Sequence, residues 1–240
     1  MHKSKNKPTV FFIQSLPIPL FMILPDFSKA FEYENDFYLS CDNTRLSKFI
    51  AHYELFKMAQ NLPGAIVECG VFKGASFTRF AGFRDLFGSA FSHKLIGFDI
   101  FGDFPATEYE DDQKYRDRFI DAAGIASVSV AQLKEILKHK GVDRNTELVA
   151  GDVTQTVPEY VKQNPHLKIA LLNLDTDIYE PAVTILEHLY PRLVRGGVLI
   201  LDDYSTFPGE TKAVDEYFKD QNIKIQKFPF AMSPCFLIKE

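Results

Sequence analysis

Cysteine is scarce in this sequence, and its spacing matches no metal-binding or redox motif. The chain has 240 residues and three cysteines, Cys41, Cys69 and Cys235, which are widely separated and include no CxxC pair. This spacing gives no sign of a disulfide framework and is typical of a protein in a reducing compartment. We therefore expect a cytoplasmic protein whose three thiols behave as small buried hydrophobic groups.

An excess of positive charge is also absent. Asp and Glu number 32 against 27 Lys and Arg, which gives a net charge of −5, and the two signs are interspersed. Because no basic stripe is present, we do not expect nucleic acid as a partner. With 46% hydrophobic residues the chain can build one substantial core, and it shows no internal repeat.

No uninterrupted apolar run reaches the roughly 20 residues that cross a membrane. Residues 1–27, MHKSKNKPTVFFIQSLPIPLFMILPDF, have a basic start and an apolar continuation, which resembles a secretory signal, but polar residues and prolines interrupt it. We expect no membrane partner. Residues 1–43 should instead form an aromatic-rich arm in front of a domain at 44–240. The arm would pack on that domain or on a second copy, so a homo-oligomer formed through it is one expectation.

Several common catalytic motifs are missing. The sequence has no GxSxG, no HExxH, no Walker sequence and no GxGxxG, so serine-hydrolase and phosphoryl-transfer chemistry have no support. The histidines show no ligand spacing and are best interpreted as surface or core residues. An NAD-dependent dehydrogenase is the weakest of the enzyme classes considered.

Strand-like and helix-like segments alternate along the chain. Short apolar runs predict buried strands at 65–70, 94–99, 146–152, 168–175 and 196–203. Helices are expected at 44–61, 71–87, 130–141, 180–193 and 211–221, and a solvated loop and helix at 106–123. Two closing runs, 223–228 and 234–239, lack a helix between them. The pattern predicts a doubly wound, mostly parallel, seven-stranded α/β sheet with an antiparallel C-terminal edge.

The first three expected strands each deliver an acid at or near their carboxyl ends, where ligands bind in such sheets. Glu68 lies within an apolar strand and needs a cationic partner, either a ligand amino group or a nearby Lys or Arg. Gly70 suits a tight turn after it. Asp99 suits ribose hydroxyls or, as the simpler alternative, an N-cap or loop acid, and Asp152 ends the third strand in the same way.

Four further acids end the next two strands. Asp175 and Asp177 follow one apolar run, and Asp202 and Asp203 follow the other. In an extended segment the first two would point the same way, because side chains alternate with period two. A hard divalent cation, Mg²⁺ or Ca²⁺, is the economical partner for such a group. The alternative is separate N-caps and salt bridges to Arg192, Arg195 or Lys212.

Together these motifs resemble the macrocin O-methyltransferase family of class I S-adenosylmethionine (SAM)-dependent methyltransferases. The resemblance is carried by GAIVECGVFKGASF, IGFDIFGDFP, GDVTQTVP and LDTDIYEPAVTILEHLYPRLVRGGVLILDDYSTFPGETKAVDEYF, in the family's order. It implies a Rossmann-like fold, S-adenosyl-L-methionine and Mg²⁺ as cofactors, and methylation of a hydroxyl on a small molecule.

Carried over by position, the resemblance implies two groups of site residues. Residues expected to bind the cofactor are Glu68, Gly70, Phe72 and Ser76 around the methionine part, Asp99 at the ribose and Asp152 beside the adenine. Residues expected to hold the metal are Asp175, Asp202 and Asp203. Asp177 is the candidate general base, although Asp175 and Asp177 both match the family's paired acids and either could take that role.

The implied acceptor is a sugar or sugar-like small molecule, such as a secondary metabolite or a surface glycan precursor. The alternatives are a catechol-type phenol, whose vicinal hydroxyls also chelate Mg²⁺, and a non-catalytic SAM-binding subunit. Two departures from the family pattern concern the acceptor side: 72–75 reads FKGA where the family tends to carry Trp-Arg-Gly-Gly, and 101–105 reads FGDFP for Phe-Glu-Gly-Leu-Pro.

Overall fold

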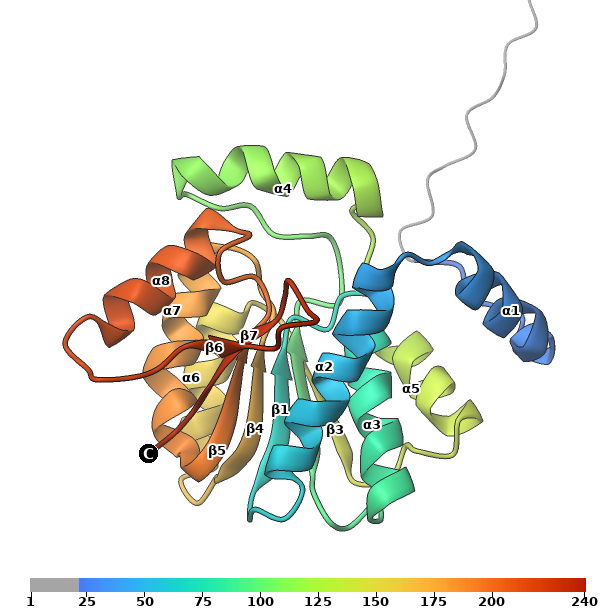
Figure 1. The fold of residues 1–240 in the computed structure, drawn as a ribbon, viewed down its shortest axis with the longest axis horizontal. Coiled ribbons are helices and arrows are strands. Elements are labelled where there is room, and N and C mark those ends of the chain that lie inside the picture. The colour runs from blue at the N-terminus through green and yellow to red at the C-terminus, as the bar shows by residue number, and fades with distance from the viewer. Residues whose placement is uncertain (1–21) are drawn as a thin grey trace, which may run out of the picture.

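The computed structural model describes residues 22–240, so the first 21 residues of the expected arm lie outside the described part. A seven-stranded sheet runs through the centre in the order β3-β2-β1-β4-β5-β7-β6 (Figure 1). The strands are β1 (Ala65–Cys69), β2 (Leu95–Asp99), β3 (Thr146–Ala150), β4 (Ile169–Leu174), β5 (Leu193–Leu201), β6 (Gln226–Lys227) and β7 (Cys235–Ile238). Strands β1 to β5 are parallel, and β7 pairs antiparallel with β5 and β6. The predicted sheet is confirmed.

Helices cover both faces of this sheet. The helices on one face are α2 (Asn43–Ala59), α3 (Ala75–Phe87) and α5 (Val130–His139), and those on the other are α6 (Val153–Gln163), α7 (Tyr179–His188) and α8 (Pro208–Phe218). Two more helices, α1 (Ala30–Ser40) and α4 (Glu110–Ala123), lie outside these layers (Figure 1). The central strands β1, β2 and β4 are buried along their whole length, which explains why they appear in the sequence as continuous apolar runs.

Helix α6 was not expected from the sequence, because Pro158 lies in its middle. A proline inside a helix removes one backbone hydrogen bond and costs about 3 kcal/mol. Here an apolar stripe offsets that cost by packing on the sheet, and Asp152 caps the helix by accepting from the Thr154 amide at 2.8 Å. Tertiary burial therefore outweighs the local propensity.

The cysteine expectation holds only in part. Cys69 and Cys235 are buried free thiols, whereas Cys41 is partly exposed because it lies between α1 and α2, outside the core. Within residues 22–240, no helix combines the length and the apolar character needed to cross a bilayer.

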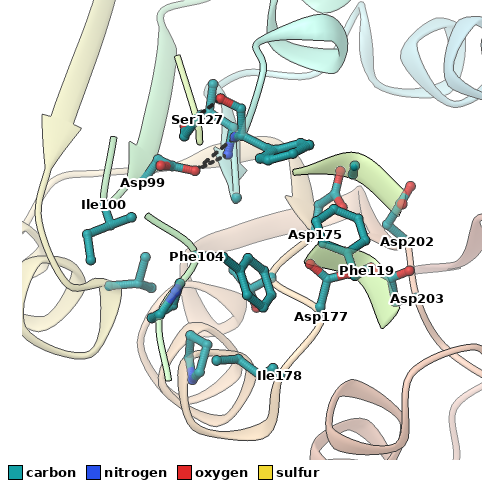
Figure 2. A pocket seen from close by; sticks show the side chains of 18 of the residues that line it. Asp99, Ile100, Phe104, Phe119, Ser127, Asp175, Asp177, Ile178, Asp202 and Asp203 are labelled. Atoms are coloured by element: carbon teal, nitrogen blue, oxygen red, sulfur yellow. Dashed lines mark hydrogen bonds between the residues drawn. The ribbon is translucent and has the colours of Figure 1, made fainter. Parts of the chain in front are cut away.

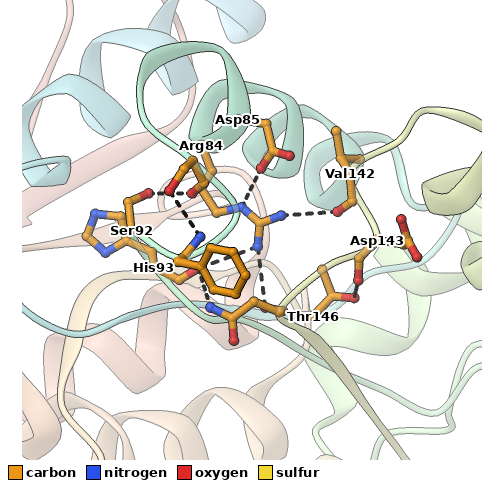
Figure 3. A network of polar contacts seen from close by, with 10 residues as sticks. Arg84, Asp85, Ser92, His93, Val142, Asp143 and Thr146 are labelled. Atoms are coloured by element: carbon orange, nitrogen blue, oxygen red, sulfur yellow. Dashed lines mark hydrogen bonds and ion pairs between the residues drawn. The ribbon is translucent and has the colours of Figure 1, made fainter.

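A buried cation fixes the far end of α3. The Arg84 side chain is fully buried and donates to the carbonyls of His93, Val142 and Asn145 at 3.1 to 3.4 Å, while its Nε pairs with Asp85 at 2.7 Å (Figure 3). One side chain thus ties α3 to the segments that lead into β2 and β3.

Replacing Arg84 should therefore destabilise the fold. Arg84→Met would leave the Val142 carbonyl without its donor, remove one of two donors from the His93 and Asn145 carbonyls, and unpair Asp85. We expect it to lower the free energy of unfolding by about 3 kcal/mol in urea titrations. Arg144→Met, at an exposed position nearby, is the control and should change it by less than about 0.5 kcal/mol. Equal stability of the two variants would contradict the role given to Arg84.

Candidate active site

A cavity of about 850 Å³ opens at the carboxyl ends of the parallel strands. It lies where the strand order reverses, between β1 and β4, which is the usual ligand position in doubly wound sheets. Eight acidic and four basic side chains line it, so its walls carry an excess of negative charge that favours a cation. Figure 2 shows the aspartates after β4 and β5 grouped on one side of this cavity.

The turn after β1 forms the floor of the cavity. Gly70 has a φ of 92°, and a Cβ there would lie 1.6 Å from the Asp175 carbonyl oxygen, so only glycine fits. Phe72 follows with a φ of 48°. This close approach of the β1 turn to the end of β4 brings the expected cofactor side and the acid cluster into one cavity.

Asp99 holds this turn in place. Its Oδ2 accepts from the Val71 and Phe72 amides at 2.7 and 2.9 Å (Figure 2). Its Oδ1 accepts from the Phe101 amide at 2.6 Å. Burial raises the pKa of Asp99, and these three amides oppose that rise. The loop-acid alternative is thus realised, yet Oδ1 keeps one lone pair for a further donor.

Glu68 lies behind the turn rather than in the cavity lining. Its Oε1 accepts from the Ser76 hydroxyl at 2.7 Å, and its Oε2 is buried with no hydrogen-bond partner among the described residues. Burial raises the pKa of Glu68 to about 8, although the Ser76 hydroxyl, Arg79 and Lys48 lower it. An orphaned buried carboxylate oxygen of this kind is satisfied by an added cationic donor.

Three acids meet at the ends of β4 and β5. Carboxylate oxygens of Asp175, Asp202 and Asp203 all lie within 4.8 Å of one another. Burial and the neighbouring negative charges raise the pKa values of Asp175 and Asp203 well above their ordinary range. Buried oxygens of Asp202 and Asp203 have no hydrogen-bond partner among the described residues, which fits a hard divalent cation bound through oxygen.

Asp177 lines the same cavity, but its backbone conformation differs from the one expected. The prediction that Asp175 and Asp177 lie in an extended segment is wrong, because Asp177 has a φ of 64°. The chain leaves the sheet after Leu174 and turns into α7, so period-two alternation no longer applies. Burial and the charge of Asp175 raise the pKa of Asp177 to about 7, and a hydrogen bond with Asp203 opposes the rise.

The positive partner of the acids comes from α2. Lys48 Nζ lies 2.5 Å from Asp202 Oδ2, and His52 Nε2 lies 3.6 Å from Asp202 Oδ1. Arg79 in turn donates to His52 Nδ1 at 2.9 Å, which places the histidine proton on Nε2. Although burial opposes it, Lys48 and His52 hold the pKa of Asp202 below its ordinary range.

These α2 residues were not expected from the sequence. The partners expected under the salt-bridge alternative were Arg192, Arg195 and Lys212, but Arg192 donates to the Pro165 carbonyl and Lys212 lies over Tyr109 and Tyr179. The available signal was the i, i+4 spacing of Lys48 and His52 on one helix face. Lys48 and Asp202 are 154 residues apart in the sequence, and no local pattern indicates a contact over such a separation.

Most of the predicted site residues come together in one cavity. Those that line it are Gly70, Phe72, Ser76, Asp99, Asp152, Asp175, Asp177, Asp202 and Asp203. Asp152 lies exposed at the rim, and Glu68 lies behind the lining. The segment 106–123 borders the cavity, and its Asp112 is fully buried, which corrects the prediction that the segment is solvated.

Comparison with known proteins shows a family whose sequence model matches most of the chain. The sequence model of the macrocin-O-methyltransferase (TylF) family matches residues 41–229. The chain is similar, at 27% identity and a TM-score of 0.71, to the crystal structure of the calicheamicin methyltransferase CalS11, with 94% of this chain and 87% of that chain covered. The apo structure of CalS11, described as a TDP-rhamnose 3'-O-methyltransferase, matches at 26% identity with a TM-score of 0.66, covering 86% and 85%.

Curated relatives are similar in sequence over part of their length. An 8-demethyl-8-(2,3-dimethoxy-alpha-L-rhamnosyl)-tetracenomycin-C 4'-O-methyltransferase of Streptomyces olivaceus is 28% identical over 62% of this chain and 56% of its own. A mycinamicin III 3''-O-methyltransferase of Micromonospora griseorubida is 27% identical over 67% of this chain and 62% of its own. The matched region thus spans less than two thirds of either relative.

The raised pKa of Glu68 predicts how stability depends on pH. Between about pH 4.5 and 8 the folded state binds more protons at Glu68 than the unfolded state does, so stability falls as pH rises through this window. The slope contributed is at most about 1.4 kcal/mol per pH unit. Urea unfolding in EDTA from pH 5 to 8 should show a flatter decline for Glu68→Gln than for the parent protein. The control Glu135→Gln, at an exposed position, should keep the parent slope, and a parent-like slope in Glu68→Gln would contradict the assignment.

Proposed function

Because this chain belongs to the macrocin O-methyltransferase family, we propose that it transfers the methyl group of SAM to a hydroxyl of a sugar or sugar-like small molecule, with Mg²⁺ bound by its acid cluster. One observation carries the proposal: three carboxylates within 4.8 Å of one another at the switch-point cavity of this sheet. Their own counter-ion, Lys48, contacts only one of them within salt-bridge distance.

The cofactor side of the proposal uses the β1, β2 and β3 ends. Glu68 would accept a hydrogen bond from the SAM amino group through its orphaned oxygen. Gly70, Phe72 and Ser76, which line the cavity, would surround the methionine part. Asp99 would accept a ribose hydroxyl at its remaining lone pair, and Asp152 would border the adenine at the rim. Preformed amides hold this floor rigid, which supports positioning of the two reactants.

The metal side uses Asp175, Asp202 and Asp203. A bound Mg²⁺ would lower the pKa of an acceptor hydroxyl. Asp177, whose pKa of about 7 suits a general base near neutral pH, would take the hydroxyl proton at a carboxylate oxygen, and Asp175 is the alternative. The acceptor oxygen would form its bond to the methyl carbon as the carbon–sulfur bond breaks, leaving S-adenosylhomocysteine (SAH).

The sugar acceptor is supported by the relatives, whose names describe transfer to rhamnosyl, mycinamicin or TDP-rhamnose hydroxyls. We would test it with labelled SAM against a panel of TDP-rhamnose, other nucleotide sugars, rhamnosides and catechols, each with Mg²⁺ and with EDTA. Transfer only to catechols would favour the phenol reading. No transfer despite SAH binding would favour a non-catalytic subunit.

We also propose that residues 1–43 form an arm in front of a domain at 44–240 and contact a second copy. Helix α1 has no buried residue, and Phe31 and Leu39 are 79% and 87% exposed. An 11-residue helix is marginal by itself in water, so a partner surface would stabilise it. The free thiols support a cytoplasmic location.

Loss of one metal ligand should separate turnover from cofactor binding. We expect Asp202→Ala to reduce Mg²⁺-dependent methyl transfer by at least about 100-fold, because the proposed metal site loses one of its three carboxylates. SAH affinity should stay within about threefold, as measured by calorimetry. Asp143→Ala, at an exposed position before β3, is the matched control. Parent-like turnover in Asp202→Ala would contradict the assignment of Asp202 as a metal ligand.

A further inference from the structure

Helix α4 lies across the cavity end of the molecule, and its one buried residue is a carboxylate (Figure 1). Asp112 is 0% exposed, although it belongs to a helix that otherwise faces solvent or the cavity. A buried charge without partners would be strongly destabilising. The contacts that Asp112 makes should therefore explain how α4 is held.

Asp112 caps two helices at once. Its Oδ1 accepts from the Gly209 amide at 2.7 Å, in the first turn of α8, and its Oδ2 accepts from the Tyr179 amide at 2.9 Å, in the first turn of α7. The residues that precede these helices, Ile178 and Phe207, provide no side-chain cap. A carboxylate at the positive ends of two helices satisfies amides that both sequences leave open.

The fit around Asp112 allows no extra atom. A Cβ on Gly209 would lie 1.9 Å from Asp112 Oδ2 and 2.5 Å from the Tyr179 amide nitrogen. Glycine at this position therefore lets α8 approach both α4 and the start of α7. The three elements meet at one point.

Helix α7 also binds the residues that lead into α4, through the side chain of Glu180. Glu180 accepts from the Glu108 and Tyr109 amides at 2.9 and 3.1 Å, and from the Thr107 hydroxyl at 3.0 Å. The two carboxylates, Asp112 from α4 and Glu180 from α7, thus form a reciprocal pair of contacts.

The helix starts joined by Asp112 lie in two segments that carry the acids, residues 175–180 and 202–210, which we call the acid loops. Asp177 is two residues before Tyr179, and its carbonyl accepts from the Glu210 amide of α8 at 3.2 Å. The Glu210 side chain accepts from the Asp203 amide at 2.9 Å. A shift of either helix start would therefore move Asp177 and Asp203, whereas the Asp175 and Asp202 amides donate to the Cys69 and Leu174 carbonyls of the sheet.

Helix α4 also brings an aromatic side chain to the cavity. The Phe119 ring lies 5.2 Å from Phe72 and 5.4 Å from Phe104, and Figure 2 shows Phe104 and Phe119 beside the aspartates. Phe119 contributes to the lining on the side that the proposed acceptor would occupy.

From this geometry we infer that Asp112 is a positioning residue: it sets the distance between the starts of α7 and α8, and through them the positions of Asp177 and Asp203 relative to Asp175 and Asp202. It also holds α4 over the cavity. The inference rests on the proposed function only in taking the cluster to be a divalent-cation site.

The test compares Asp112→Ala and Asp112→Asn with Asp117→Ala, a control on the same helix whose side chain is 75% exposed. Hydrogen–deuterium exchange should rise in Asp112→Ala at residues 107–123, 175–180 and 202–210. Mn²⁺ affinity, measured by electron paramagnetic resonance of the free ion, should weaken at least about tenfold, with SAH affinity within about threefold. Asparagine keeps one acceptor oxygen and should give an intermediate result, and it serves if the alanine variant does not fold. Asp117→Ala should match the parent.

Parent-like Mn²⁺ affinity in Asp112→Ala, or unchanged exchange at 175–180 and 202–210, would overturn the inference and leave Asp112 as a structural cap. A parent protein that binds no Mn²⁺ would instead overturn the metal in the proposed function. In that case exchange alone decides the inference: it stands if exchange at both acid loops rises in Asp112→Ala and not in Asp117→Ala, and falls otherwise.

Discussion

The repulsion among acids at one end of the sheet is the constraint on which the site depends. Asp175, Asp177, Asp202 and Asp203 are gathered where solvent screens them poorly, and burial together with mutual repulsion raises the pKa of three of them. Lys48 and His52 lower the pKa of the fourth, Asp202. One lysine does not neutralise four carboxylates, and the proposed divalent cation would supply positive charge at the oxygen ligands that it prefers.

The surrounding structure can be understood as the scaffold that holds these acids together against their repulsion. The β1 turn approaches β4 so closely that Gly70 is required, and Asp99 fixes that turn through three amides. On the opposite side, Glu210 supports Asp203 and Asp112 joins the two helix starts. In this scaffold the carboxylates of Asp99, Glu210 and Asp112 accept hydrogen bonds from backbone amides.

Much of the fold could be predicted from the sequence, because parallel strands buried on both faces leave continuous apolar runs and their carboxyl ends share one edge. That reasoning predicted β1 to β5 and the acids at their carboxyl ends, and the family resemblance added Phe72 and Ser76. Nine of the proposed site residues line one cavity. It failed at α6, where tertiary burial outweighs Pro158, and at Asp177, where a left-handed residue replaces the expected extended chain. The partners Lys48 and Asp112 could not be predicted, since each pairs with groups 67 to 154 residues away and no local pattern records such a contact.

The central claim is that this cavity binds SAM at residues distinct from the acid cluster, and calorimetric titration of SAH tests it most directly. SAH should be titrated into the purified protein with Mg²⁺ and again with EDTA. The account predicts micromolar binding in both conditions, because the cofactor residues on β1, β2 and β3 are distinct from the acids on β4 and β5. Absence of binding in both conditions would contradict it and return the acid cluster to a structural role or to another metal chemistry.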